Sequence, residues 1–168
     1  PAHEPRRVRA VIFADQETSL SAAETAARRA EAGLNVVTVT DYSQAYSLGA
    51  ATADAEIDAG ADLLIPGGEE HARVPAVVMA TITQTEPVVI VGKQRSVETW
   101  KREITAIRDA MFRARNLEGM ELVESCQSTV LAATVGFIAR AAERRTPLLV
   151  DAPLTATAAL LAERDNPG

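Results

Sequence analysis

A short polar turn follows a buried strand near the middle of the chain. The strand Asp62–Ile65 leads directly into PGGEEH at residues 66–71, and a helix is expected to follow. In open α/β sheets, ligands bind outside the carboxyl ends of the strands, where turns of this kind lie. The two glycines let the backbone approach a ligand closely or adopt a positive φ. The carboxylates and the imidazole that follow could take a proton as general bases.

Each of these residues also has a structural explanation. Gly67 and Gly68 lack the spacing of a Walker loop or of a dinucleotide fingerprint, so they could simply form a turn. Glu69 and Glu70 would repel a phosphate rather than bind it. His71 beside them could be a solvated turn histidine. A ligand site with Glu69 or Glu70 as its base and an ordinary surface turn both remain open.

Polar residues also follow the other strands. Because the carboxyl ends of parallel strands share one edge of a sheet, the residues that follow them should gather there. We expect this edge to contain Asp15, Asp41, the turn at 66–71, Gly92–Arg95 and Asp151. Lys93 and Arg95 would be its phosphate partners. The alternative is that polar residues end these strands as they do in any α/β protein.

The elements that position these residues alternate along the chain. Apolar runs predict strands at Val8–Ala14, Leu34–Thr40, Asp62–Ile65, Pro87–Gly92 and Pro147–Asp151. Helices are predicted at residues 21–32, 43–59, 74–83, 96–115, 128–145 and 153–164, with a break at 116–119. Ser21 with Glu24 has the pattern of a capping box, Gly33 and Gly60 are predicted helix stops, and Ser96 is a predicted N-cap.

This alternation predicts an α/β fold. Five apolar strands between helices indicate a Rossmann-like three-layer domain with a mostly parallel sheet of about five strands, covered on both faces. The length of 168 residues suits a single domain, which we place at residues 6–164. We expect residues 1–5 and 165–168 to be frayed. Only six residues are aromatic, so the core should be aliphatic.

Composition excludes several functional classes. A formal net charge of -6 argues against a nucleic-acid partner, and no apolar run approaches the roughly 20 residues of a membrane helix. One cysteine and two distant histidines form no metal-ligand cluster, and no cofactor is expected. The lone Cys126 permits no internal disulfide, which favours a cytoplasmic location. Near a helix start its thiolate could be stabilised, but without a partner histidine we expect a buried, unreactive thiol.

Longer segments resemble one enzyme family. They are ADAEIDAGADLLIPG (53–67), WKREITAIRDAMFRAR (100–115) and VGFIARAAERRTPLLVDAPLTATAALLAER (135–164), preceded by the shorter RAVIFAD (9–15). Together they are similar to nicotinate-nucleotide:dimethylbenzimidazole phosphoribosyltransferase, which makes the lower-ligand nucleotide of cobalamin. The resemblance runs from Val8 to Arg164. It implies a parallel α/β sheet of Rossmann type, a nucleotide and an azole as small-molecule ligands, and commonly a homodimer.

The resemblance implies a site whose residues are altered here. The family's Asp-His-Gly after the first strand is Asp15-Gln16-Glu17. After the third strand, Glu69 stands at the acidic position, but the Asn-Thr-Thr that cradles the phosphate and ribose is missing. The glycine-rich loop after the next strand is shortened to GKQRSVET (92–99). A family lysine aligns with Glu103, which we expect to repel phosphate.

Two further positions of the implied site also differ. The family's Gly-Gly before the late helix aligns with Gln127 and Ser128, and its Asp-Gly after the fifth strand is Asp151-Ala152. The ligand-binding positions implied by the resemblance are therefore Asp15, Gly67, Gly68, Lys93, Arg95, Gln127, Ser128 and Asp151. The family's catalytic glutamate, in a Leu-Gly-Glu-Gly-Thr-Gly stretch, has no counterpart in these 168 residues. A longer product could carry it, so the expectation below depends on the internal loops.

Three functions remain open. The first is a non-catalytic relative that binds a nucleotide, an azole or a protein partner such as a paralogous enzyme. The second is an active minimal transferase, in which Lys93 or Arg95 holds the phosphate and Glu69 or Glu70 is the base. The third is a structural domain that forms homodimers through the helix at 100–115, with Trp100 in the contact. The altered loops favour the first.

Overall fold

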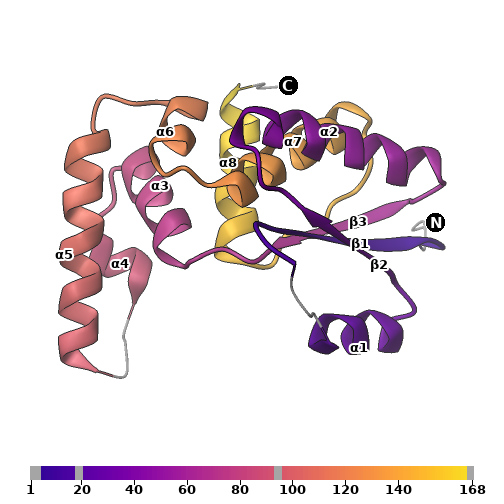
Figure 1. Cartoon of the computed structure of the whole chain (residues 1–168), viewed down its shortest axis with the longest axis horizontal. Helices are drawn as coiled ribbons and strands as arrows, with labels where there is room; N and C mark the ends of the chain where they lie inside the picture. Colours follow the sequence, from indigo (N-terminus) through magenta and orange to yellow (C-terminus); the bar gives the residue numbers. More distant parts are fainter. Residues whose placement is uncertain (1–4, 18–20, 93–95, 166–168) are drawn as a thin grey trace.

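The computed structural model describes residues 5–17, 21–92 and 96–165 (Figure 1). Its strands are β1 (Val8–Ala14), β2 (Gly33–Thr38) and β3 (Leu63–Gly68). Its helices are α1 (Ser21–Arg29), α2 (Tyr42–Asp58), α3 (Arg73–Thr83), α4 (Pro87–Val91), α5 (Val97–Ala114), α6 (Gly119–Ser125), α7 (Thr129–Glu143) and α8 (Pro153–Asp165). The fold is α/β, as the alternation of elements predicts.

The described strands form a parallel sheet in the order β2-β1-β3. In its register, Ile12 of β1 lies opposite Val36 of β2 and Gly67 of β3. The predicted fifth strand, Pro147–Asp151, is present only as a parallel bridge between Leu64 and Leu148. The Leu64 amide donates to the Pro147 carbonyl at 3.0 Å, and the Leu149 amide donates to the Leu64 carbonyl at 2.9 Å. This segment therefore extends the sheet beside β3 without forming a full strand.

The predicted fourth strand, Pro87–Gly92, is wrong. These residues form the short helix α4, which Gly92 ends with a φ of +64°. Pro87 stands at the first helical position, where its fixed φ suits a helix and its missing N–H removes no hydrogen bond. Val88 and Val89 are 37% and 68% exposed, unlike the side chains of a buried strand. A five-residue apolar run does not distinguish a short helix from a strand by its pattern.

Local signals place most of the other helices correctly. Asp41 caps α2 by accepting a hydrogen bond from the Ser43 amide at 2.9 Å. Ser96 caps α5 as predicted and accepts from the Thr99 amide at 3.4 Å. The predicted stop at Gly33 is wrong, because α1 ends at Arg29 and Gly33 already belongs to β2. The helix α6, after the predicted break, was not assigned from sequence.

The main core lies between the sheet and one layer of helices. On that face, the Phe13 ring of β1 meets the Phe137 ring of α7 edge-on at 5.7 Å between centroids. Helices α2 and α7 cross closely at Gly49 of α2, where a side chain would not fit. A Cβ at this position would lie 1.9 Å from the Ala133 carbonyl oxygen of α7. On the opposite face, Figure 1 shows α1 below β2. Within the described residues, no helix has both the length and the apolar character to cross a membrane.

Candidate functional site

The carboxyl ends of β1 and β3 lead to the predicted site. Asp15 follows β1 in an exposed bend, and Glu69 and Glu70 follow β3 directly. The Glu69 amide donates to the Phe13 carbonyl at 2.9 Å, so the backbone pairing of the two strands continues into the turn. Asp151 is exposed in the segment before α8. The described residues give neither Asp15 nor Asp151 a side-chain hydrogen bond to the turn.

Glu70 contacts the start of α7. Its Oε2 accepts a hydrogen bond from the hydroxyl of Ser128, and its Oε1 accepts one from the His71 amide at 2.7 Å. Ser128 is the N-cap of α7, and its hydroxyl oxygen accepts from the Leu131 amide at 2.9 Å. A carboxylate at a helix N-terminus is stabilised by the positive end of the helix dipole. The candidate base Glu70 and the predicted ligand residue Ser128, which lie 58 positions apart, are therefore hydrogen-bonded to each other.

The two glycines of the turn have different environments. Neither uses the freedom of a glycine to adopt a positive φ, since the described glycines with a positive φ are Gly60, Gly92 and Gly119. A Cβ at Gly68 would lie 2.5 Å from Val130 Cγ1 of α7 and 2.7 Å from a Leu154 methyl of α8. A Cβ at Gly67 would make only ordinary contacts, the nearest at 3.5 Å. Gly68 therefore permits two helices to pack on the end of β3, whereas a side chain at Gly67 would meet no clash.

Gln127, beside Ser128, has the backbone conformation of a glycine. Its φ is +52°, in the left-handed region that side chains disfavour. Its side-chain amide donates to the Glu124 carbonyl at 2.8 Å, which closes the end of α6. The positive φ of Gln127 is one that a glycine adopts easily, which agrees with the alignment of Gln127 and Ser128 with the Gly-Gly of the family. The side chain of Gln127 is directed to α6.

Glu103 does not present a free charge. The guanidinium of Arg73, at the start of α3, donates to both Glu103 oxygens at 3.0 and 2.7 Å. These hydrogen bonds hold the pKa of Glu103 below its usual value. The expected repulsion of phosphate by Glu103 stays a prediction, and the ion pair with Arg73 of α3 would weaken it. No pattern in the sequence indicated this partner beyond an arginine at a helix start.

The histidine is exposed, and the cysteine is less buried than expected. His71 is exposed, and its Nδ1 accepts from the Arg73 amide at 3.2 Å. Cys126 ends α6 and is half-buried; burial, together with the nearby charge of Glu70, raises the pKa of its thiol. Burial also raises the pKa of Tyr42 to about 12, with the charge of Glu124 contributing. Both groups are therefore protonated at neutral pH.

The two predicted phosphate partners, Lys93 and Arg95, lie outside the described residues. Among the residues that are described, no group of three or more histidine, cysteine, aspartate or glutamate side chains could hold a metal ion. At this edge the described residues supply carboxylates, a capping hydroxyl and a glycine without a close neighbour. The start of α7, where a helix N-terminus could receive an anion, is contacted by Glu70.

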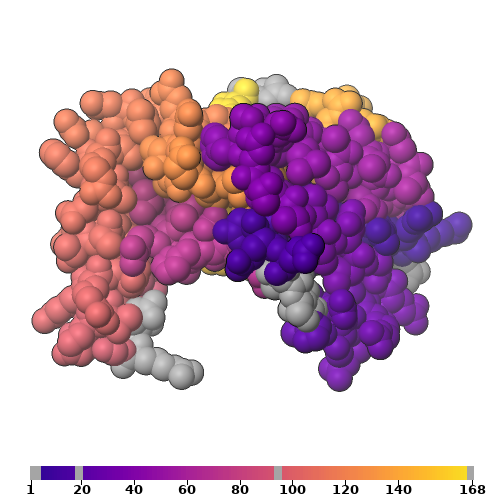
Figure 2. All heavy atoms as spheres, viewed as in Figure 1, coloured from indigo at the N-terminus to yellow at the C-terminus, as the bar shows by residue number. Residues whose placement is uncertain are grey.

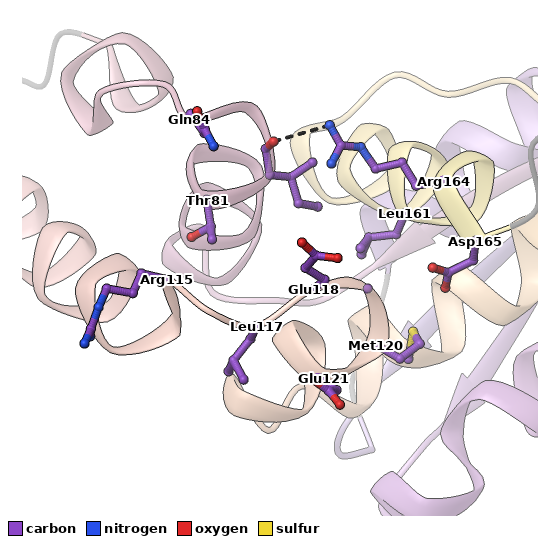
Figure 3. Close-up of a pocket in the computed structure, with 12 residues that line it drawn as sticks. Thr81, Gln84, Arg115, Leu117, Glu118, Met120, Glu121, Leu161, Arg164 and Asp165 are labelled. Carbon is purple, nitrogen blue, oxygen red and sulfur yellow. Dashed lines mark hydrogen bonds between the residues drawn. The ribbon is translucent and has the colours of Figure 1, made fainter.

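A separate cavity of about 760 Å³ lies away from the strand ends, between the end of α3, the start of α6 and the end of α8 (Figure 3). The Glu118 carboxylate points into it, and Asp165 lies across from it. The Arg164 guanidinium donates to the carbonyl of Ile82 at 3.3 Å and so satisfies the end of α3. None of the predicted site residues lines this cavity.

Comparison with known proteins decides the family. The profile of the family described as Phosphoribosyltransferase matches residues 10–168. The chain belongs to this family. A relative from Corynebacterium glutamicum, "Nicotinate-nucleotide--dimethylbenzimidazole phosphoribosyltransferase", is 44% identical over 140 residues, or 80% of this chain. A relative of the same name from Mycobacterium ulcerans is also 44% identical over 140 residues. The predicted resemblance is therefore confirmed.

The solved structures agree in fold and differ in length. The crystal structure of CobT from Thermus thermophilus superposes with a TM-score of 0.82 at 18% identity, over 98% of this chain and 68% of that chain. The matched region is only 39% of the length of the Corynebacterium relative. This chain therefore spans well under half the length of the curated relatives that it matches.

Proposed function

We propose that this chain is a non-catalytic member of the phosphoribosyltransferase family, whose anion position is occupied by its own Glu70. The observation that carries the proposal is the hydrogen bond from the Ser128 hydroxyl to Glu70 at the start of α7. Helix N-termini at the strand ends of α/β folds are ready-made sites for phosphate groups. Here an internal carboxylate lies at that place.

Electrostatics explain why an internal carboxylate would exclude a nucleotide. A phosphate beside Glu70 would place two like charges near contact distance. The repulsion is about 1–4 kcal/mol at aqueous to surface dielectric. That range corresponds to about a 5-fold to several-hundred-fold loss of affinity.

Arg73, the cationic residue that follows the turn most closely in sequence, also supports a non-catalytic role. Arg73 could neutralise a phosphate, but both of its donors that face Glu103 are already used, in bonds of 3.0 and 2.7 Å. Recruiting Arg73 to a ligand would leave Glu103 without its partner. The Arg73–Glu103 pair therefore stabilises the packing of α3 on α5 and holds the cation away from a substrate.

The test is calorimetry with nicotinate mononucleotide and with dimethylbenzimidazole, the two compounds in the name of the relatives. The wild-type protein should bind neither, and it should form no α-ribazole phosphate at high protein concentration. Glu70→Gln removes the charge but keeps the size, so this variant should gain measurable affinity for the mononucleotide. Glu69→Gln is the matched control, because Glu69 is exposed and its carboxylate has no described partner.

Three results would contradict the proposal. Tight mononucleotide binding by the wild type would show that Glu70 leaves the anion position. Formation of α-ribazole phosphate would establish the active minimal transferase instead, with Glu69 or Glu70 as its base. Equal behaviour of the Glu70→Gln and Glu69→Gln variants would remove the special role of the contact with Ser128.

A further inference from the structure

A smaller cavity of about 380 Å³, called the α3–α5 pocket below, lies between α3, α5 and the end of α6. Figure 2 shows α5 in salmon on one side of the molecule, with α6 in orange and α3 in magenta next to it. The described residues that line the pocket are Arg73, Val74, Val77, Ala110, Arg113, Ala114, Ser125 and Cys126. Glu70 and Ser128, which meet at the start of α7, are not among them. The volume is within the range of about 300–1,000 Å³ that is typical of small-molecule sites.

The charges around the α3–α5 pocket have one sign. The guanidiniums of Arg73 and Arg113 line it, and the described part of its wall contains no carboxylate. Arg73 is already bound by Glu103, through hydrogen bonds of 3.0 and 2.7 Å. Arg113 is exposed, and within the described residues its side chain has neither an ion pair nor a hydrogen bond. In a chain with a net charge of -6, this wall therefore offers an available cation.

The remainder of the α3–α5 pocket suits an apolar group. Val74 and Val77 line it from α3. Ala110 and Ala114 line it from α5, and their short side chains leave space that longer ones would fill. Because Arg113 follows Ala110 by three positions, the two side chains lie on the same face of α5. A molecule with an apolar body and one anionic group therefore matches the lining.

We propose that the α3–α5 pocket binds a small monocarboxylate with an apolar body, whose carboxylate pairs with Arg113 while its body lies against the valines and alanines. A guanidinium binds a carboxylate through two parallel hydrogen bonds. One available guanidinium balances one negative charge, whereas a phosphate monoester carries about 1.5–2 at neutral pH. The site goes beyond the non-catalytic function and does not depend on it, because it uses none of the groups at the start of α7.

The test uses benzoate as the probe and Cys126 as the reporter. Benzoate binding is measured by an NMR titration, and its place is found from the rate at which iodoacetamide alkylates Cys126, the single cysteine of the chain. Burial raises the pKa of this thiol, so the reaction is run at mildly alkaline pH. At about ten times its Kd, benzoate should slow the alkylation about tenfold by mass action. Benzamide, which lacks the charge, and acetate, which lacks the ring, should bind much more weakly.

Matched variants separate the cation from the apolar part. Arg113→Gln changes an exposed side chain and should weaken benzoate binding about tenfold or more, as expected for the loss of a charge-assisted hydrogen bond. Arg102→Gln is the control and should bind benzoate as the wild type does, because Arg102 is exposed on the same helix but does not line the pocket. Ala110→Leu would fill the apolar part and should prevent benzoate binding.

Several results would overturn the proposal. The first is a wild-type protein that does not bind benzoate, or that binds it without any slower alkylation of Cys126. Equal benzoate affinities of the Arg113→Gln and Arg102→Gln variants would exclude the ion pair. Benzamide binding as tight as benzoate binding would show an apolar pocket without charge selection, and tighter binding of phenyl phosphate would identify a phosphate site instead.

Discussion

Replacing Gly68 by alanine tests whether this glycine serves packing or a ligand. The added Cβ would lie 2.5 Å from Val130 Cγ1, 2.7 Å from Leu154 Cδ2 and 3.2 Å from the Phe13 carbonyl oxygen. Val130 and Leu154 are only 2% and 7% exposed, so neither side chain can move into solvent. Alanine at this position therefore overpacks the junction of β3 with α7 and α8.

The expected destabilisation follows from two opposing terms. Inserting a methyl group into a packed core costs about 1–3 kcal/mol. Replacing glycine also restricts the unfolded chain, which stabilises the fold by about 0.4–1 kcal/mol. Gly67→Ala has the second term without the first, because its nearest neighbour would lie at 3.5 Å. The difference between the two variants should thus be about 1–3 kcal/mol.

Thermal unfolding without any ligand measures this difference. For a chain of this length, each kcal/mol shifts Tm by about 2–4 °C. Gly68→Ala should therefore melt about 2–12 °C below Gly67→Ala, and urea unfolding should give the same order. Equal melting temperatures would refute the packing explanation and return Gly68 to the candidate ligand residues.

Two further variants test the backbone of the site and the charge at the other end of the sheet. Gln127→Gly and Gln127→Ala both lose the hydrogen bond to the Glu124 carbonyl, but only alanine retains a side chain at φ +52°. Urea unfolding should therefore show the glycine variant to be more stable by about 1 kcal/mol. A more stable alanine variant would contradict the left-handed geometry of this residue. Burial alone would raise the pKa of Glu56, but hydrogen bonds from Arg9 and Asn35 outweigh it and hold that pKa below its ordinary value. The stabilisation is therefore present above the unfolded pKa of about 4.3 and lost as pH falls through the lower folded pKa. Glu56→Gln should be about 1–3 kcal/mol less stable at pH 7, with the gap to wild type narrowing below about pH 4; a constant gap would contradict this.

Local signals in the sequence were sufficient for much of the fold. The apolar run at Val8–Ala14 and the Ser96 cap both correspond to observed elements, because each depends on neighbours within a few residues. The run at Pro87–Gly92 failed because a short apolar helix and a short strand have the same composition. The segment at Pro147–Asp151 has strand-like residues, but only Leu148 bridges to β3.

Contacts between segments that are distant in the sequence could not be predicted from local sequence patterns. A glycine inside a helix usually weakens it, yet the missing side chain of Gly49 lets α2 approach the Ala133 carbonyl of α7. Glu70 and Ser128 were each predicted as site residues, but the bond between them joins segments 58 residues apart. The partner of Glu103 could not be found either, because Arg73 lies 30 positions earlier on another helix.

The contact between Glu70 and Ser128 links the stability of the fold to its affinity for anions. A carboxylate at a helix N-terminus stabilises the helix by about 0.3–1 kcal/mol, and up to about 2 kcal/mol when partly buried. Glu70→Gln should therefore lose stability in the same variant that gains mononucleotide affinity. If Glu70 were a surface residue unrelated to the anion position, its replacement would change neither the stability nor the mononucleotide affinity. If its role were purely structural, the replacement would change the stability alone. Because an added phosphate would restore the missing charge, nicotinate mononucleotide should raise the Tm of Glu70→Gln back toward that of the wild type. A ligand that bound the unfolded chain would lower the Tm instead.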